Sequence, residues 1–213
     1  MAIAVQNLAD LRGSYVDLSF RVIGKTLPAD HGYKLYSAIA HACPEFHENS
    51  QLSFQTISGI PDKKGKIYLQ DWSNLRIRLP CDYIPLVCKL AGKDLSIYNH
   101  RIQLGIPQIF PLQPAEHLRS RIVVIKHYLE PDSFTAAAQL QLDNLGISAT
   151  AVIPMDEQGQ PDRKTIKIRQ HLIVGFSLEV HNLKDTDSVK LQILGLGGRR
   201  NMACGFFTAK DFK

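Results

Sequence analysis

Cysteine is scarce in this sequence, with four residues in 213. No two of them form a C-x-x-C pair, and none stands with histidine at the spacing of a zinc site. A disulfide framework needs a higher density of cysteine, so we expect reduced thiols in a cytoplasmic protein. The four thiols are those of Cys43, Cys81, Cys88 and Cys204.

Long apolar runs and acidic clusters are also missing. No stretch approaches the ~20 apolar residues of a membrane helix. The first residues lack the basic start and apolar stretch of a signal peptide, so no membrane association is expected. The sequence has no acidic cluster of the kind that holds two metal ions in many nucleases. It also has no G-x-x-x-x-G-K-[ST] loop for a nucleotide. We therefore expect neither a metal nor a cofactor.

Aromatic residues make up only 8% of the chain, and no aromatic pair suits base stacking on an open sheet, as in an RRM. The net charge is +5, which is compatible with a polyanionic partner but does not identify one. Hydrophobic residues make up 45%, the usual level for a chain that buries a core. A length of 213 residues allows one large domain or two small ones.

The first half alternates between strand and helix patterns. Val16, Leu18, Phe20 and Val22 share one face of a strand by period-two spacing. A helix is expected from His31 to Cys43 with Asp30 as its N-cap, and Pro44 ends it. The order strand, helix, strands, helix, strand is the ferredoxin-like βαββαβ plan with an extra strand. The expected strands are 14–23, 52–57, 66–70, 75–79 and 95–106, and the second helix is 82–91.

The second half repeats this order after a proline-rich stretch. Pro107, Pro111 and Pro114 predict a domain boundary near residue 113. The fold class is therefore α+β, with two tandem ferredoxin-like, RRM-like domains at 1–113 and 114–213. The expected strands of the second domain are 119–128, 147–154, 164–170, 172–180 and 204–208, and the helices are 132–145 and about 185–194. The extended region 164–180 is either a bent strand or a hairpin.

A glycine-rich segment near the end is the strongest local signal. It contains Gly195, Gly197, Gly198 and Gly205, with Arg199 and Arg200 between them. Glycine allows backbone to approach a phosphate, consecutive amides can bind an anion, and arginine has forked donors for phosphate. A helix C-cap followed by a solvated turn would have the same pattern. Glycine spacing alone favours that simpler interpretation.

Two motifs carry a resemblance to a known family. Gly195-Leu196-Gly197, five residues, then Ala203-Cys204-Gly205 is similar to the glycine-rich loop of the RAMP superfamily, with Ala203 where glycine is usual. The segment Val16–Tyr33, with LPADHGY before a helix, resembles the opening of the Cas-six-type CRISPR repeat endoribonucleases, in their myxobacterial-subtype branch. The stretch Leu90–Leu95 is similar too. The resemblance implies tandem ferredoxin-like domains, CRISPR repeat RNA as substrate, and cleavage without a metal.

The resemblance also indicates the catalytic residue. Members of the family place a catalytic histidine near the start of the first helix, and His31 matches that place. A histidine can transfer a proton near neutral pH. Some relatives pair this histidine with tyrosine, serine or lysine, and the candidates here are Tyr36, Ser37 and Lys25. His41 and His47 are expected to be solvated.

Basic residues on one side of extended segments give the expected RNA-binding surface. Lys167 and Arg169 alternate with Ile166 and Ile168, and Arg119 and Arg121 share a side of another strand. Such rows can follow a phosphate backbone, and an outward charged sheet face would have the same pattern. The expected RNA-binding residues are Gly195, Gly197, Gly198, Arg199, Arg200, Lys167, Arg169, Arg119 and Arg121.

The sequence is therefore interpreted as an endoribonuclease that cuts CRISPR precursor RNA and binds the repeat as substrate and product. Subunits of a CRISPR effector complex are further expected partners, and DNA is not. The alternative is a non-catalytic RAMP subunit that holds guide RNA. It would share the fold and the glycine-rich segment, so His31 distinguishes the two. A nucleotide-binding enzyme fits less well, since the glycines precede a strand and not a helix.

Overall fold

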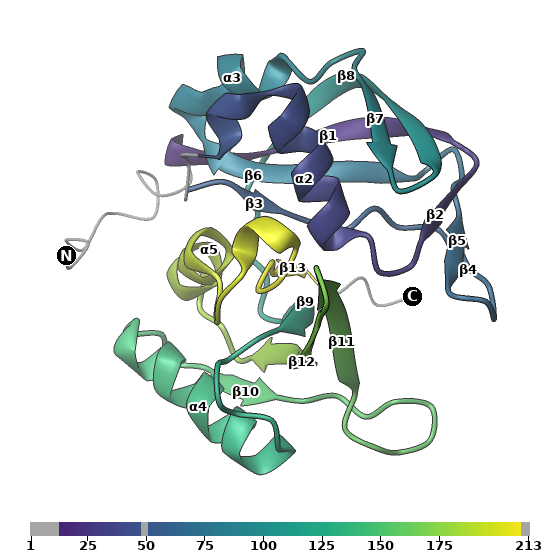
Figure 1. Cartoon of the computed structure of the whole chain (residues 1–213). Coiled ribbons are helices and arrows are strands. Elements are labelled where there is room, and N and C mark those ends of the chain that lie inside the picture. Colours follow the sequence, from purple (N-terminus) through teal and green to yellow (C-terminus); the bar gives the residue numbers. More distant parts are fainter. Residues whose placement is uncertain (1–12, 48–50, 210–213) are drawn as a thin grey trace. The chain divides into compact units, whose positions relative to one another are not determined.

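The computed structural model describes residues 13–47 and 51–209, and these form two compact units (Figure 1). The N-terminal unit comprises Tyr15–Pro111 together with Asn201–Ala203. The C-terminal unit comprises Leu112–Arg200 with the described residues 13–14 and 204–209. The short segment Asn201–Ala203 of the glycine-rich stretch therefore packs with the first half of the chain.

The N-terminal unit has a five-stranded sheet in the order β3-β6-β1-β8-β7. Strands β8, β1, β6 and β3 give the 4-1-3-2 order of the ferredoxin-like fold, and β7 is additional. A second, three-stranded sheet has the order β2-β5-β4. The elements are β1 (Tyr15–Gly24), β2 (Thr26–Pro28), α2 (Gly32–Ala42), η1 (Pro44–Phe46), β3 (Ser53–Phe54), β4 (Ile60–Pro61), β5 (Lys66–Tyr68), β6 (Asn74–Pro80), η2 (Cys81–Tyr83), α3 (Ile84–Cys88), β7 (Asp94–Ile97) and β8 (His100–Pro111).

The C-terminal unit has the strand order β10-β12-β9-β13, with β11 paired to β12. Read from β13, this is again 4-1-3-2, so both units confirm the predicted ferredoxin-like class. The extended region 164–180 is a hairpin of β11 and β12. The elements are β9 (Leu118–Val123), α4 (Pro131–Asn144), β10 (Thr150–Val152), β11 (Arg163–Ile168), β12 (His171–His181), α5 (Asp185–Leu194), η3 (Arg200–Met202, which crosses between the units) and β13 (Thr208–Ala209).

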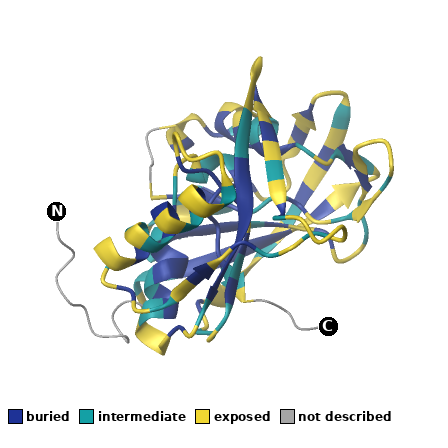
Figure 2. Ribbon diagram, turned by 90° about the horizontal axis from the view of Figure 1, so that it is seen from below, coloured by how far each residue is buried: buried dark blue, intermediate teal, exposed yellow. Residues whose placement is uncertain are grey.

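Each unit buries its own core between helices and sheet, and exposed positions line the outer sides (Figure 2). In the N-terminal unit, α2 crosses the sheet in front of β1 and β6 (Figure 1). Its buried Leu35 and Ile39 pack with Leu18 and Phe20 of β1. In the C-terminal unit, the rings of Phe134 and Phe176 join α4 to β12 at a centroid distance of 4.8 Å. Burying large apolar side chains in this way supplies the main stabilisation of each sheet.

A buried ion pair crosses the sheet of the N-terminal unit. Asp17 on β1 lies opposite Arg78 on β6. The Arg78 Nε and Nη2 atoms donate to Asp17 Oδ1 and Oδ2 at 2.8 and 3.0 Å. The Arg78 side chain is only 1% exposed, while Arg76, two residues earlier on β6, is 39% exposed and 3.9 Å from the same carboxylate. The bidentate geometry offsets the cost of removing both charges from water.

Candidate functional site

His31 immediately precedes α2 and is its N-cap, although its side chain makes no capping hydrogen bond. The expected N-cap at Asp30 was therefore one residue early. The His31 ring is 1% exposed and is bound at both nitrogens. Nδ1 lies 2.7 Å from the carbonyl oxygen of Pro28, and Nε2 lies 3.0 Å from the amide nitrogen of Ile57. A carbonyl only accepts and an amide only donates, so these partners select the neutral ring with its proton on Nδ1.

These two hydrogen bonds tie the end of β2 to the segment after β3, across the start of α2. They also define a condition for the acid–base role that the sequence predicts for His31. In this conformation Nε2 holds the Ile57 amide, so proton transfer at that nitrogen requires the amide to be exchanged for the substrate.

The start of α2 meets the glycine-rich segment within the N-terminal unit. A Cβ atom at Gly32 would lie 2.7 Å from the carbonyl oxygen of Met202 and 3.5 Å from Cβ of Ala203. Only glycine allows such an approach of the Asn201–Ala203 backbone. Ala203 itself has φ of 64°, the left-handed conformation that glycine would adopt freely. The two sequence motifs, about 170 residues apart, are thus side by side in space.

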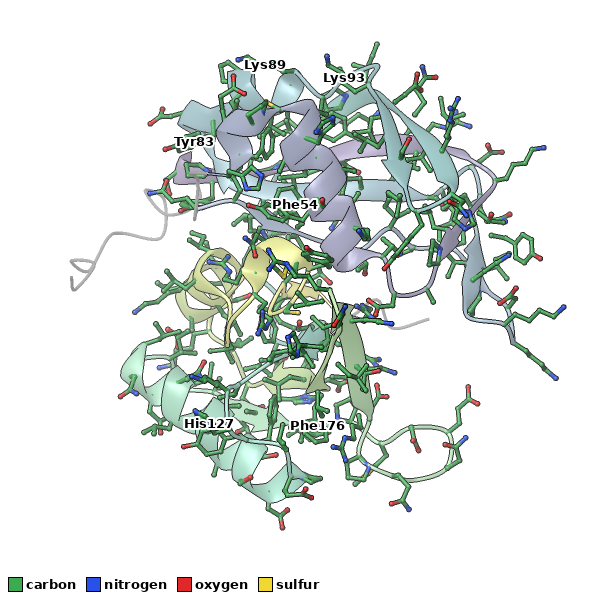
Figure 3. The ribbon with its side chains drawn as sticks, in the orientation of Figure 1. Phe54, Tyr83, Lys89, Lys93, His127 and Phe176 are labelled. Atoms are coloured by element: carbon green, nitrogen blue, oxygen red, sulfur yellow. The ribbon has the colours of Figure 1, made fainter. Side chains whose placement is uncertain are left out.

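The three expected partners of His31 lie in different environments. Tyr36 is 8% exposed, and its ring is edge-on to Phe54 of β3 at 5.8 Å between centroids. Figure 3 labels Phe54 below α2. Ser37 is exposed on α2, and Lys25 is exposed between β1 and β2. Tyr36 is therefore a core side chain, while Ser37 and Lys25 are accessible to solvent.

His47, which the sequence predicts to be solvated, is a second histidine near the expected site residues. Its ring is exposed and lies edge-on to Tyr36, with 5.8 Å between the centroids. It follows η1, and its amide donates to the carbonyl of Pro44. His41, in the last turn of α2, is also exposed. His47 is thus an accessible histidine beside a predicted site residue, a neighbourhood that single-sequence spacing does not reveal.

The glycines of the C-terminal unit bring backbone segments close together. Cβ atoms at Gly195 and Gly205 would clash with the carbonyl oxygens of Gly205 and Leu196, and Gly195, Gly197 and Gly205 all have positive φ. The amides of this segment point inward. Gly197 donates to Gln141 Oε1, Gly198 to the Val124 carbonyl, and Gly205 to the Ile122 carbonyl. These amides are engaged within the fold, so the glycines serve backbone packing, and the expected contacts with phosphate would have to come from side chains.

The two arginines of the segment have different surroundings. Arg199 is exposed, with φ of 63°. Arg200 is half-buried, and its Nη2 donates to the carbonyl of Ile193 in the last turn of α5 at 2.6 Å. A cation at that position satisfies a helix-end carbonyl and complements the helix dipole.

The substitutions Arg199→Ala and Arg200→Ala should therefore have different effects. Arg199→Ala should weaken RNA binding and lower the slope of log K against log salt by about 0.7–0.9, the value for one lost phosphate contact. Arg200→Ala should instead lower the thermal midpoint, since it removes the hydrogen bond to the Ile193 carbonyl in the last turn of α5. Salt titrations of affinity and thermal melts of both variants measure this. An Arg199→Ala protein with the wild-type salt slope would remove Arg199 from the RNA-binding surface.

The other expected RNA-binding residues also separate into two groups. Lys167 and Arg169 are exposed at the end of the β11–β12 hairpin, while Ile166 and Ile168 are buried. Arg121 is exposed as well. Arg119 lies 3.5 Å from Asp162 Oδ2 and 3.7 Å from Glu179 Oε1, so nearby carboxylates compensate its charge.

Asp162 is central to that compensating network. Burial would raise the pKa of its carboxyl, but hydrogen bonds from Lys164 and Ser177, with the charges of Lys164 and Arg119, outweigh burial and lower the pKa below its usual range. Asp162 therefore stays ionised and holds Arg119 at neutral pH. Lys167, Arg169 and Arg121, the other members of this set, are exposed to solvent.

Across residues 13–47 and 51–209, no three His, Cys, Asp or Glu side chains are grouped so that they could hold a metal ion. Within the same ranges, no helix has both the length and the apolar character to cross a membrane.

A protein-family match and a curated relative point to the same family. The protein family described as Cas6 Crispr matches residues 16–211 of this chain. The CRISPR-associated endonuclease Cas6 of Myxococcus xanthus (strain DK1622) is 34% identical over 193 residues, which cover 91% of this chain and 80% of the relative.

Solved structures agree at the level of fold. A Cas6-related protein from Pyrococcus furiosus has a TM-score of 0.66 at 12% identity, covering 94% of this chain and 100% of that one. A RAMP protein that binds different RNA substrates has a TM-score of 0.59 at 13% identity, covering 91% and 98%. At these identities the likeness shows the ferredoxin-like arrangement alone.

Proposed function

Since the chain belongs to the Cas6 family of CRISPR RNA-processing endoribonucleases, we propose that it cuts precursor RNA within each repeat by attack of a ribose 2′-OH on the adjacent phosphorus. The new P–O2′ bond forms as the P–O5′ bond breaks. A base takes the proton of the 2′-OH, and an acid gives a proton to the leaving 5′-oxygen. The products are a 2′,3′-cyclic phosphate and a 5′-OH. The RNA supplies its own nucleophile, so the protein mainly positions it.

The observation that carries this proposal is the juxtaposition of His31–Gly32 with Asn201–Ala203. The family's two motifs meet there within one unit. We assign the acid–base role to His31, on the condition that substrate binding exchanges the Ile57 amide at Nε2. Tyr36, Ser37 and Lys25 are its proposed partners. Lys25, exposed between β1 and β2 of the same unit, is a cation suited to stabilise the charged phosphate.

Cleavage without a metal ion is part of the proposal. The chemistry is proton transfer at two oxygens, which a histidine with a pKa near neutrality can supply.

The remaining assignments follow from the family and the sequence. We propose the domain division at residue 113, binding of the repeat RNA as precursor and product, association with effector-complex subunits, and a cytoplasmic location. The RNA-binding surface is proposed to include Arg199, Lys167, Arg169 and Arg121. The glycines Gly195, Gly197 and Gly198 shape its backbone.

Product analysis tests the proposal against the alternative of a non-catalytic RNA-binding RAMP subunit. The protein is incubated with a repeat RNA, and the fragments are treated with polynucleotide kinase without prior phosphatase. Fragments that accept a labelled 5′-phosphate carry the expected 5′-OH. Tight binding of intact RNA with no fragments would support the alternative.

A further inference from the structure

A cavity of about 520 Å³ lies wholly within the C-terminal unit. Its wall comes from the segment after β9, from α4, from the start of β12 and from Gly197–Arg199. This volume is within the ~300–1,000 Å³ of typical small-ligand sites. The glycine-rich segment contributes backbone to its edge, because the Gly198 amide is bonded to the Val124 carbonyl.

The lining combines apolar surface with cations. Leu129 and Leu172 line the cavity and are 48% and 66% exposed, unusually high values for leucine side chains beside a concave surface. Lys126, His127 and Arg199 line it as well, and all three are exposed. The lining includes no acidic residue. An apolar pocket surrounded by positive charge fits a ligand that is flat and apolar at one end and anionic at the other.

Backbone conformation gives a second, independent reason to expect a ligand here. His127 and Arg199 have φ of 73° and 63°, in the left-handed region of backbone conformation that residues other than glycine rarely adopt. Both residues line this one cavity, and Figure 3 labels His127 on its connecting segment. Strained backbone of this kind is concentrated where a side chain must be held in one direction for binding.

The cavity also continues the basic row of the β11–β12 hairpin. Leu172 is paired directly with Lys167, and Arg169 and His171 form the adjacent exposed tip. A phosphate backbone that follows Lys167 and Arg169 therefore reaches the cavity opening at Leu172. The ligand is thus expected to be part of a polynucleotide and not a free small molecule.

We propose that this cavity binds one unstacked nucleotide of the RNA ligand. The base packs against Leu129 and Leu172, and the adjoining phosphate lies towards Lys126, His127 and Arg199. This site rests on the proposed function, since it names where that RNA is held. It concerns binding only and assigns none of these residues to the chemical step.

The test compares abasic substitution in the RNA with truncation in the protein. A repeat RNA panel carries one abasic nucleotide at each position in turn, and Kd is measured for the wild type, Leu129→Ala/Leu172→Ala and Leu140→Ala. Leu140 is the matched control, a leucine of α4 that is 57% exposed and does not line the cavity. The wild type should lose affinity by about 5–100-fold at one position, an effect of the size that stacking of one base has in single-stranded nucleic-acid binding.

The double variant should bind intact RNA correspondingly more weakly and show no further loss with that abasic RNA. Equal abasic losses in the double variant and in Leu140→Ala would overturn the site. Leu172→Ala alone repeats the test if the double variant has a lowered thermal midpoint, because so exposed a side chain contributes little to folding. If the wild type cuts repeat RNA while these affinities are unchanged, the site fails and the proposed function stands. If base-specific losses of affinity occur without any cleavage, the site stands and the proposed function fails.

Discussion

Replacing His31 by alanine is expected to lower the single-turnover rate of repeat RNA cleavage by about 10²–10⁴-fold, the usual effect of losing an acid–base group. The Kd for RNA should change little, because one neutral imidazole adds little to binding dominated by phosphate contacts. His31→Ala also removes two buried hydrogen bonds, to Pro28 and Ile57, so its thermal midpoint should fall as well. Rate, affinity and thermal midpoint therefore have to be measured together.

A second substitution separates proton transfer from structural support. His31→Asn keeps a donor for the Pro28 carbonyl but has no group that titrates near neutral pH. It should recover part of the thermal midpoint and none of the rate. His41→Ala is the matched control, an exposed histidine of the same helix. A His31→Asn rate near that of the wild type would make His31 a positioning residue. The proton-transfer role would then move to His47, and His47→Ala would be measured next.

Of the substitutions considered, truncation of Arg78 should produce the largest loss of unfolding free energy. Arg78→Ala leaves the buried carboxylate of Asp17 without its bidentate partner, and removing one member of a buried pair costs about 3–5 kcal/mol of unfolding free energy. Chemical denaturation, followed by a probe in the N-terminal unit, measures the change.

The control for this prediction lies on the same strand. Arg76→Ala removes a cation that is 39% exposed and 3.9 Å from the same carboxylate, so it should cost less than about 1 kcal/mol. Replacing both buried partners, as in Asp17→Leu with Arg78→Met, should recover much of the loss, since no charge then stays buried alone. Equal unfolding free energies for Arg76→Ala and Arg78→Ala would show that burial of the Asp17–Arg78 pair is not what stabilises this sheet.

Strands and helices could be predicted from the sequence because burial of one face makes apolar residues recur at a regular spacing. Leu18, Phe20 and Val22 of β1 are buried as their alternation predicts. The helix expected from His31 to Cys43 is α2, Gly32–Ala42. Two βαββαβ halves followed from the order of such elements, because short connections allow few topologies.

Elements bounded by unusual backbone could not be predicted in the same way. The extended region expected at 95–106 is a hairpin of β7 and β8, which turns at Tyr98 with φ of 53°. No glycine marks that turn. The helix expected at 82–91 is shorter, with η2 followed by α3 at Ile84–Cys88. Strand ends and short helices depend on tertiary hydrogen bonds that period alone does not encode.

The candidate site was predictable in residue type and not in orientation. The sequence shows Arg199 and Arg200 as equivalent neighbours, but Arg200 caps the Ile193 carbonyl while Arg199 is exposed. Arg119 and Arg121 share a strand side, and the spacing gives no sign that Arg119 faces Asp162 and Glu179. The contacts that engage the His31 ring come from residues on both sides of α2. Such contacts are set by the folded chain and have no signature in local spacing.

The central claim is that a side chain, and not a metal ion, transfers the protons during RNA cleavage. Its most direct test is single-turnover cleavage of a repeat RNA by the full-length protein, with and without excess EDTA. The expected result is the same rate in both, with a 2′,3′-cyclic phosphate and a 5′-OH at one position in the repeat. Loss of cleavage in EDTA that added Mg²⁺ or Mn²⁺ restores would contradict the claim.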